Sequence, residues 1–135
     1  MNRKLLNSYI KNLKKQGTHL LVRDNILSLF ADLQYAGHVV IKLMLDEDSN
    51  LEISEYIGMS NDGSRRTNKI TRELERIFRE YCFEIENFGY YQISLRRTCN
   101  PQSTEEIQEE VHKFLDVFDR CYLHYQQSMG VNFCR

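Results

Sequence analysis

The sequence has few of the features that mark unusual classes of protein. It contains one proline and six glycines in 135 residues, so its composition gives no case for disorder and favours regular helices and strands. No apolar run approaches the roughly 18 to 20 residues that a membrane span requires. We therefore expect a soluble chain without a membrane partner, folded as a single domain over residues 1–135.

Cysteines are present, but without an export signal. Cys82, Cys99, Cys121 and Cys134 are even in number, yet no signal peptide precedes them, because lysines and arginines interrupt any hydrophobic stretch near the N-terminus. Reduced thiols in a cytoplasmic protein are the expectation.

Recognisable catalytic and metal-binding motifs are also missing. The four histidines have no nucleophile in a recognisable setting nearby, and the glycines are too scattered for a phosphate-binding loop. Cys121 and His124 could share a metal, but no paired motif supplies further ligands. Asp46, Glu47 and Asp48 fit a solvated turn better than a calcium loop. We expect a protein that is not an enzyme and that has no cofactor and no metal.

The charges are unevenly distributed, although the formal net charge is only −1. Residues 1–23 hold six basic and no acidic side chains, whereas residues 103–126 hold six acidic and two basic ones. Such segregation suits an acidic partner, and it also suits a homodimer in which the two ends attract each other.

The stretch Ser64–Tyr81 has the clearest helical pattern. Ile70, Leu74 and Ile77 lie on one predicted face, and cations repeat every three or four residues on the opposite face. Like charges at these spacings cost roughly 0.2–0.5 kcal/mol per pair in a solvated helix, so stability alone does not explain them. The cations, which we predict to bind a partner, are Arg65, Lys69, Arg72, Arg76 and Arg79.

A second basic helix is predicted over Asn2–Gln16, with Gly17 as its C-cap. Its apolar residues point inward, and we assign a partner-binding role to Lys4, Lys11 and Lys15 on its outer face, although a merely solvated face would show the same pattern.

The remaining pattern predicts an α+β fold with the order ααββαββα and an antiparallel sheet of about four strands in two hairpins. Residues 1–37 form the N-terminal helices, residues 38–126 a hairpin-helix-hairpin-helix block, and residues 127–135 a tail. The predicted elements after the first helix are a helix over Val22–Ala36, strands over Val39–Leu45 and Leu51–Ile57, the helix over Ser64–Tyr81, strands over Cys82–Ile85 and Tyr90–Arg97, and a final helix that begins at Ser103 with an S-x-x-E capping box.

The block from Val39 to Tyr125, with RELERIFREY in its first helix and STEEIQEEVHKFLDVFDRCY in its last, resembles the fold shared by type III secretion chaperones and the YbjN family. The resemblance is one of topology. It implies a small, often dimeric, non-catalytic protein that holds a partner polypeptide.

A winged helix is the competing interpretation. LEISEYIGMS would begin a helix-turn-helix, RRTNKITRELERIF would be the recognition helix, and FEIENFGYYQISL would be the wing. Two functional hypotheses follow. In the first, the protein is an adaptor, chaperone-like protein or inhibitor that docks an acidic protein or nucleoprotein through its basic helix face and sheet edge. In the second, it is a nucleic-acid-binding regulator that places the cations of residues 65–79 on phosphates.

Overall fold

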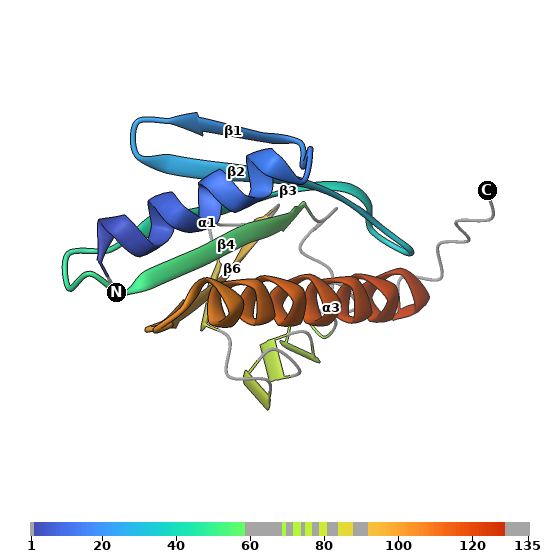
Figure 1. The fold of residues 1–135 in the computed structure, drawn as a ribbon. Coiled ribbons are helices and arrows are strands. Elements are labelled where there is room, and N and C mark those ends of the chain that lie inside the picture. The colour runs from blue at the N-terminus through green and yellow to red at the C-terminus, as the bar shows by residue number, and fades with distance from the viewer. Residues whose placement is uncertain are drawn as a thin grey trace.

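The computed structural model describes residues 2–58, 69, 72–73, 75–76, 79–80, 84–87 and 92–128. These residues form a six-stranded antiparallel sheet in the order β1-β2-β3-β4-β6-β5, with α1 and α3 lying on the same face of it (Figure 1). The elements are α1 (Arg3–Lys15), β1 (Leu20–Arg23), β2 (Ile26–Leu33), β3 (Gly37–Leu45), β4 (Leu51–Gly58), β5 (Glu84–Asn87), β6 (Gln92–Cys99) and α3 (Thr104–Ser128). The predicted α+β class is confirmed.

The core lies between the two helices and the sheet. Strands β2, β3 and β4 contribute alternate side chains to it, as the two-residue period of a strand requires, and α1 and α3 each contribute one apolar stripe. The helix-facing strand residues include Leu29, Ile41 and Ile53, and Phe114 of α3 is the largest of the fully buried side chains. Tyr9 of α1 joins the two helices by donating its hydroxyl to Gln108 Oε1 at 2.5 Å.

The predicted helix over Val22–Ala36 is wrong, because this stretch forms most of the β1–β2 hairpin. Asp24 and Asn25 connect the strands with positive φ angles of 53° and 64°, the conformation of a two-residue type I′ turn that Asp and Asn tolerate. The apolar residues also alternate along β2, and pairing with β3 sets Leu27 opposite Leu43 and Leu29 opposite Ile41. Burial on the helix-facing side therefore follows the strand period.

The hairpin of β3 and β4 is confirmed close to its predicted bounds. Asp46 organises its turn, since its Oδ1 accepts hydrogen bonds from the amides of Asp48 and Asn50, both at 2.9 Å. The amide of Asp46 donates to the carbonyl of Asn50 at 2.9 Å, which closes the loop. Asp46 thus has a local structural role.

The second predicted hairpin is also present, shifted by about two residues towards the C-terminus as β5 and β6. Strands β1 and β2 raise the sheet from the predicted four or so strands to six. At the start of α3, Ser103 Oγ accepts from the amide of Glu106 at 3.1 Å, as the capping box predicts. The Glu106 carboxylate accepts from the amide of Gln102 at 2.6 Å, one residue earlier than the motif implies.

Helix α3 ends at Ser128, so most of the predicted tail, residues 129–135, lies outside the described residues.

The predicted central helix, residues 64–81, is described at seven positions, all of which are helical: Lys69, Arg72, Glu73, Glu75, Arg76, Arg79 and Glu80. We call residues 64–81 the central segment. Among the residues that the structure describes, no helix is long and apolar enough to cross a membrane.

Candidate functional site

Helix α1 separates its apolar and basic residues as the sequence predicts. Leu6, Tyr9 and Leu13 are buried against the sheet and α3, and the outer face carries exposed lysines. The three predicted partner-binding residues of this helix, Lys4, Lys11 and Lys15, are all exposed, as is Lys14. The lysine face of α1 is therefore available to a partner along most of its length.

Strand β1 forms one edge of the sheet, and its side chains are unusually exposed for apolar residues. Leu21 is 48% exposed and Val22 is 45% exposed. The strand has only four residues, and short edge strands are one way in which proteins limit edge pairing. Its two large exposed apolar side chains are not explained by that strategy.

The backbone of β1 also has outward-facing hydrogen-bonding groups. The amide of Phe30 donates to the carbonyl of His19 at 3.3 Å, and hydrogen-bonded pairs alternate along an antiparallel ladder. Leu21 opposite Ser28 is therefore the next bonded pair, whereas Leu20 and Val22 direct their amides and carbonyls to the outer edge. Within the described residues, no strand pairs with that edge.

A shallow groove connects this edge with the lysine face of α1. It has a volume of about 320 Å³ and is lined by Val22 of β1 and by four residues of α1, namely Asn7, Ile10, Lys11 and Lys14. Ile10 and Val22 provide its apolar surface, and the two lysines provide its charge. We call this feature the α1–β1 groove.

The described cations of the central segment are exposed, as predicted, but they have acidic neighbours. Arg72, Arg76 and Arg79 line an open hollow of about 520 Å³ together with Glu75 and Glu80. Arg76 Nη1 lies 3.1 Å from Glu80 Oε1, and both side chains are well exposed. The hollow is consequently less cationic than the arginine pattern alone suggests.

The other two predicted cations of this segment are Lys69 and Arg65. Lys69 is helical and exposed, whereas Arg65 lies outside the described residues. The central segment is linked to α3 by Glu73, whose Oε2 lies 3.6 Å from His124 Nε2. Lys11 of α1 and the described arginines of the central segment line separate hollows.

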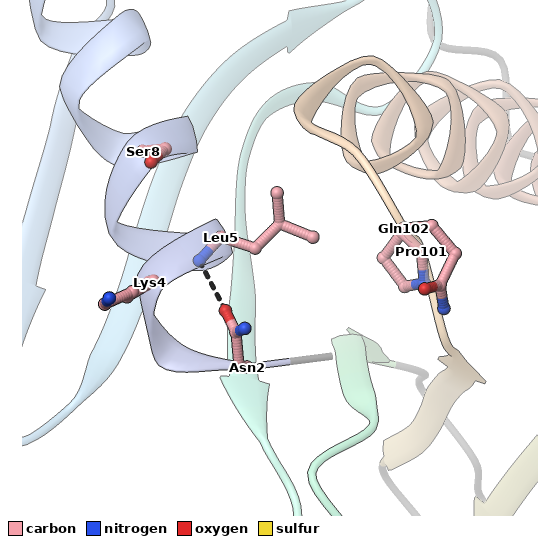
Figure 2. A pocket seen from close by; sticks show the side chains of 6 residues that line it. All are labelled: Asn2, Lys4, Leu5, Ser8, Pro101 and Gln102. Atoms are coloured by element: carbon pink, nitrogen blue, oxygen red, sulfur yellow. Dashed lines mark hydrogen bonds between the residues drawn. The ribbon is translucent and has the colours of Figure 1, made fainter.

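A further hollow, of about 560 Å³, lies at the N-terminal end of α1 (Figure 2). In Figure 2, Leu5 points across the hollow towards Pro101 and Gln102, which come from the loop between β6 and α3, whereas Lys4 points away from them. Asn2 caps α1 by accepting a hydrogen bond from the amide of Leu5 at 2.9 Å. The polar group nearest the helix start is therefore already used within the fold.

Three titratable groups with perturbed pKa values, Cys99, Glu110 and Cys121, lie on β6 and α3 and have structural roles. Arg97 of β6 donates to Glu110 of α3 at 2.5 Å and 3.3 Å. This hydrogen bonding holds the pKa of Glu110 below its ordinary value, against the opposing effect of burial. Burial, with a contribution from Glu110, raises the pKa of Cys99 to about 11, and burial raises that of Cys121 to about 12. Both thiols are therefore protonated at neutral pH and poorly reactive.

Metal ligands do not converge in the part of the chain that the structure describes. There, no group of three or more histidine, cysteine, aspartate or glutamate side chains is placed to hold a metal ion. His112 is held by Gln108 at 2.7 Å, and Cys121 is buried in the core. The pairing of Cys121 with His124, for which the sequence supplies no further ligands, is therefore not extended by a third described ligand.

Sequence reasoning missed the α1–β1 groove because it placed Val22 in a helix. The signal that could have found it was the Asp24-Asn25 pair between two alternating apolar stretches, which is a hairpin pattern.

The comparisons with known proteins extend only to the fold. No family model matches the sequence, and no curated protein matches it. Among solved structures, YbjN from E. coli, described as a candidate transcription regulator, superposes with a TM-score of 0.64 over 92% of this chain and 93% of that chain, at 11% sequence identity. At so low an identity the similarity shows the fold alone, and it confirms the predicted fold-level resemblance of this chain to YbjN-like proteins.

Proposed function

We propose that this chain is a non-catalytic protein that binds an extended, acidic segment of a partner protein in the α1–β1 groove, as an adaptor, chaperone-like protein or inhibitor. The observation that carries the proposal is the combination, in one place, of an edge strand with outward-facing backbone groups and a flanking row of lysines.

The edge of β1 supports addition of a strand. An incoming segment in an extended conformation would pair with the outward-facing groups of Leu20 and Val22, and main-chain hydrogen bonds of this kind supply affinity without demanding a particular sequence. Side chains of the added strand would cover part of the exposed side chain of Val22 and add an apolar contribution. Alternate side chains of the segment would then face α1.

The charge of the groove selects the partner. Lys11 and Lys14 flank the position of the added strand, so acidic side chains at alternate positions are favoured there. A second copy of this chain fits poorly. Antiparallel pairing of two β1 strands about a two-fold axis would place both α1 helices on the same face of a continuous sheet, with their lysine faces close together.

The arginines of the central segment offer a second contact for an acidic partner. Lys69, Arg72 and Arg79 are exposed, and arginine forks suit carboxylates as well as phosphates. These same residues keep the nucleic-acid-binding hypothesis as the second candidate. That hypothesis predicts affinity that falls steeply with salt, with a logarithmic slope of about −0.9 per phosphate contacted on duplex DNA.

The test is affinity capture with purified protein from a lysate divided into nuclease-treated and untreated halves, with recovered proteins and nucleic acids identified. The groove variant is Lys11→Glu with Lys14→Glu. Its matched control is Lys113→Glu with Arg120→Glu, which makes the same change in net charge at exposed positions outside the groove.

We expect a protein partner that survives nuclease, is lost with the groove variant and is retained by the control. Recovery that disappears with nuclease would favour the second candidate, and equal recovery by the two charge variants would refute a role for the groove.

A further inference from the structure

The sheet face opposite the helices contains a hollow that neither basic surface includes. Pairing of Phe30 with Val40 and of Asp32 with His38 places these four side chains together on that face, because Val39, which lies between His38 and Val40, points into the core. With His19 beside them, they line a hollow of about 390 Å³. We propose that this hollow binds the base of a guanine nucleotide, a planar heterocycle with adjacent N–H donors.

The aromatic side of the hollow favours a flat ring. The imidazole of His19 stacks on the ring of Phe30 with centroids 4.1 Å apart and planes 12° from parallel. Phe30 remains 37% exposed, which is a large exposure for an apolar ring within a strand. A third planar ring packed against this pair would cover that surface, and base–aromatic stacking is a principal source of affinity for unpaired bases.

The polar side of the hollow favours a ligand with hydrogen-bond donors. His38 Nδ1 donates to Asp32 Oδ1 on the open surface. The second carboxylate oxygen of Asp32 can only accept a hydrogen bond when the group is ionised. Guanine presents the N1–H and the exocyclic amine on one edge, whereas adenine presents an amine beside a bare ring nitrogen, so the carboxylate prefers guanine.

The surroundings orient the nucleotide. A phosphate placed at Asp32 would be repelled, but Lys42 lies on the same face, two residues beyond Val40 along β3, or roughly 6.6 Å away at the rise of a strand. Lys42 is exposed. The base therefore lies between Phe30 and Asp32, and its phosphate extends towards Lys42. The volume falls in the range of about 300–1,000 Å³ that small-molecule sites occupy, which suits one nucleotide.

The proposal is independent of the proposed function, because the hollow and the α1–β1 groove lie on different parts of the sheet. Its test is titration of the ¹⁵N-labelled chain with guanosine 5′-monophosphate, adenosine 5′-monophosphate and ribose 5-phosphate, followed by amide chemical shifts. A single-stranded hexanucleotide with one guanine forms a fourth arm and shows whether a base within a strand enters as readily as the free nucleotide.

We expect the guanine nucleotide to shift the amides of Phe30, Asp32 and Val40 and to bind at least fivefold more tightly than the adenine nucleotide. Asp32→Asn should remove that preference, and Phe30→Ala should weaken binding at least fivefold. The control Tyr35→Ala, which removes an exposed aromatic ring outside the lining of the hollow, should leave binding unchanged.

Three results would overturn the proposal. The first is equal shifts with ribose 5-phosphate, which would indicate a phosphate site only, and the second is unchanged binding in Phe30→Ala. The third is the absence of shifts with either nucleotide at 10 mM, a level about tenfold above a Kd of 1 mM.

Discussion

Replacing Glu110 by glutamine is expected to destabilise the fold in a pH-dependent way. The side chains of Arg97 and Glu110 are only 16% and 24% exposed, and two hydrogen bonds join them. Removing one partner of a fully buried pair costs about 3–5 kcal/mol. Because both groups keep some solvent contact, the cost here should be about 2 kcal/mol. An unfolding entropy of about 2.1 cal/mol/K per residue then predicts a decrease in Tm of about 7 °C at pH 7.

The pH dependence follows from the direction of the pKa shift. The folded-state pKa of Glu110 is lowered from an ordinary value of 4.5 by its hydrogen bonds with Arg97. Its stabilising contribution is therefore fully present above that ordinary value and is lost as the pH falls through the folded-state pKa. The stability difference between the wild type and Glu110→Gln should accordingly shrink as the pH is lowered from about 5.

Urea unfolding followed by circular dichroism between pH 3 and pH 7 measures this difference. The control is Glu109→Gln, which neutralises an exposed neighbour on the same helix and should change stability by less than about 0.5 kcal/mol. A Glu110→Gln variant as stable as the wild type at pH 7, or a loss that stays constant down to pH 3, would refute the reasoning.

Three further predictions concern α3 and the residues around it. Asp119→Ala removes the acceptor for two amides of the β2–β3 turn, at 3.0 Å and 2.9 Å, and should lower the free energy of unfolding by about 1–3 kcal/mol. Its control, Asp116→Ala, breaks an exposed ion pair and should lower it by less than about 1 kcal/mol in the same urea titration. Phe114→Ala leaves a cavity at a fully buried position and should cost about 3–5 kcal/mol; a smaller loss would show that the core is less well packed than its burial indicates. In a variant whose other two cysteines are replaced by serine, Cys99 and Cys121 should react with iodoacetamide at pH 7.5 about a hundredfold more slowly in the native than in the urea-unfolded chain. Comparable rates in the two states would contradict their raised pKa values of about 11 and 12.

The parts of the fold that the sequence predicted correctly are those in which only one periodicity fits. Val39, Ile41 and Leu43 alternate without a helical stripe, and the hairpin they begin was predicted close to its observed bounds. The final helix was marked by a capping signal at Ser103 as well as by its apolar stripe. Where local signals and periodicity agreed, the element was found.

The stretch 22–36 was mispredicted because its apolar residues fit both periods. Ile26, Leu29 and Leu33 recur at helical spacings, and Leu27, Leu29 and Leu33 also alternate as in a strand. Pairing with β3 decides between the two, and this long-range contact is not visible in a local pattern. The exposure of the lysines on α1 could be predicted from one helix, but the α1–β1 groove required β1 to be recognised first.

The most direct test of the proposed function is hydrogen exchange at the outer edge of β1 with the captured partner bound. The amides of Leu20 and Val22 should become strongly protected, while that of Leu21, which already faces β2, should change little. Val22→Pro removes one outward-facing donor without taking a hydrogen bond from the β1–β2 ladder, and it should weaken binding while leaving the fold intact. A partner that leaves the amides of Leu20 and Val22 unprotected, or that binds Val22→Pro as tightly as the wild type, would contradict docking at this edge.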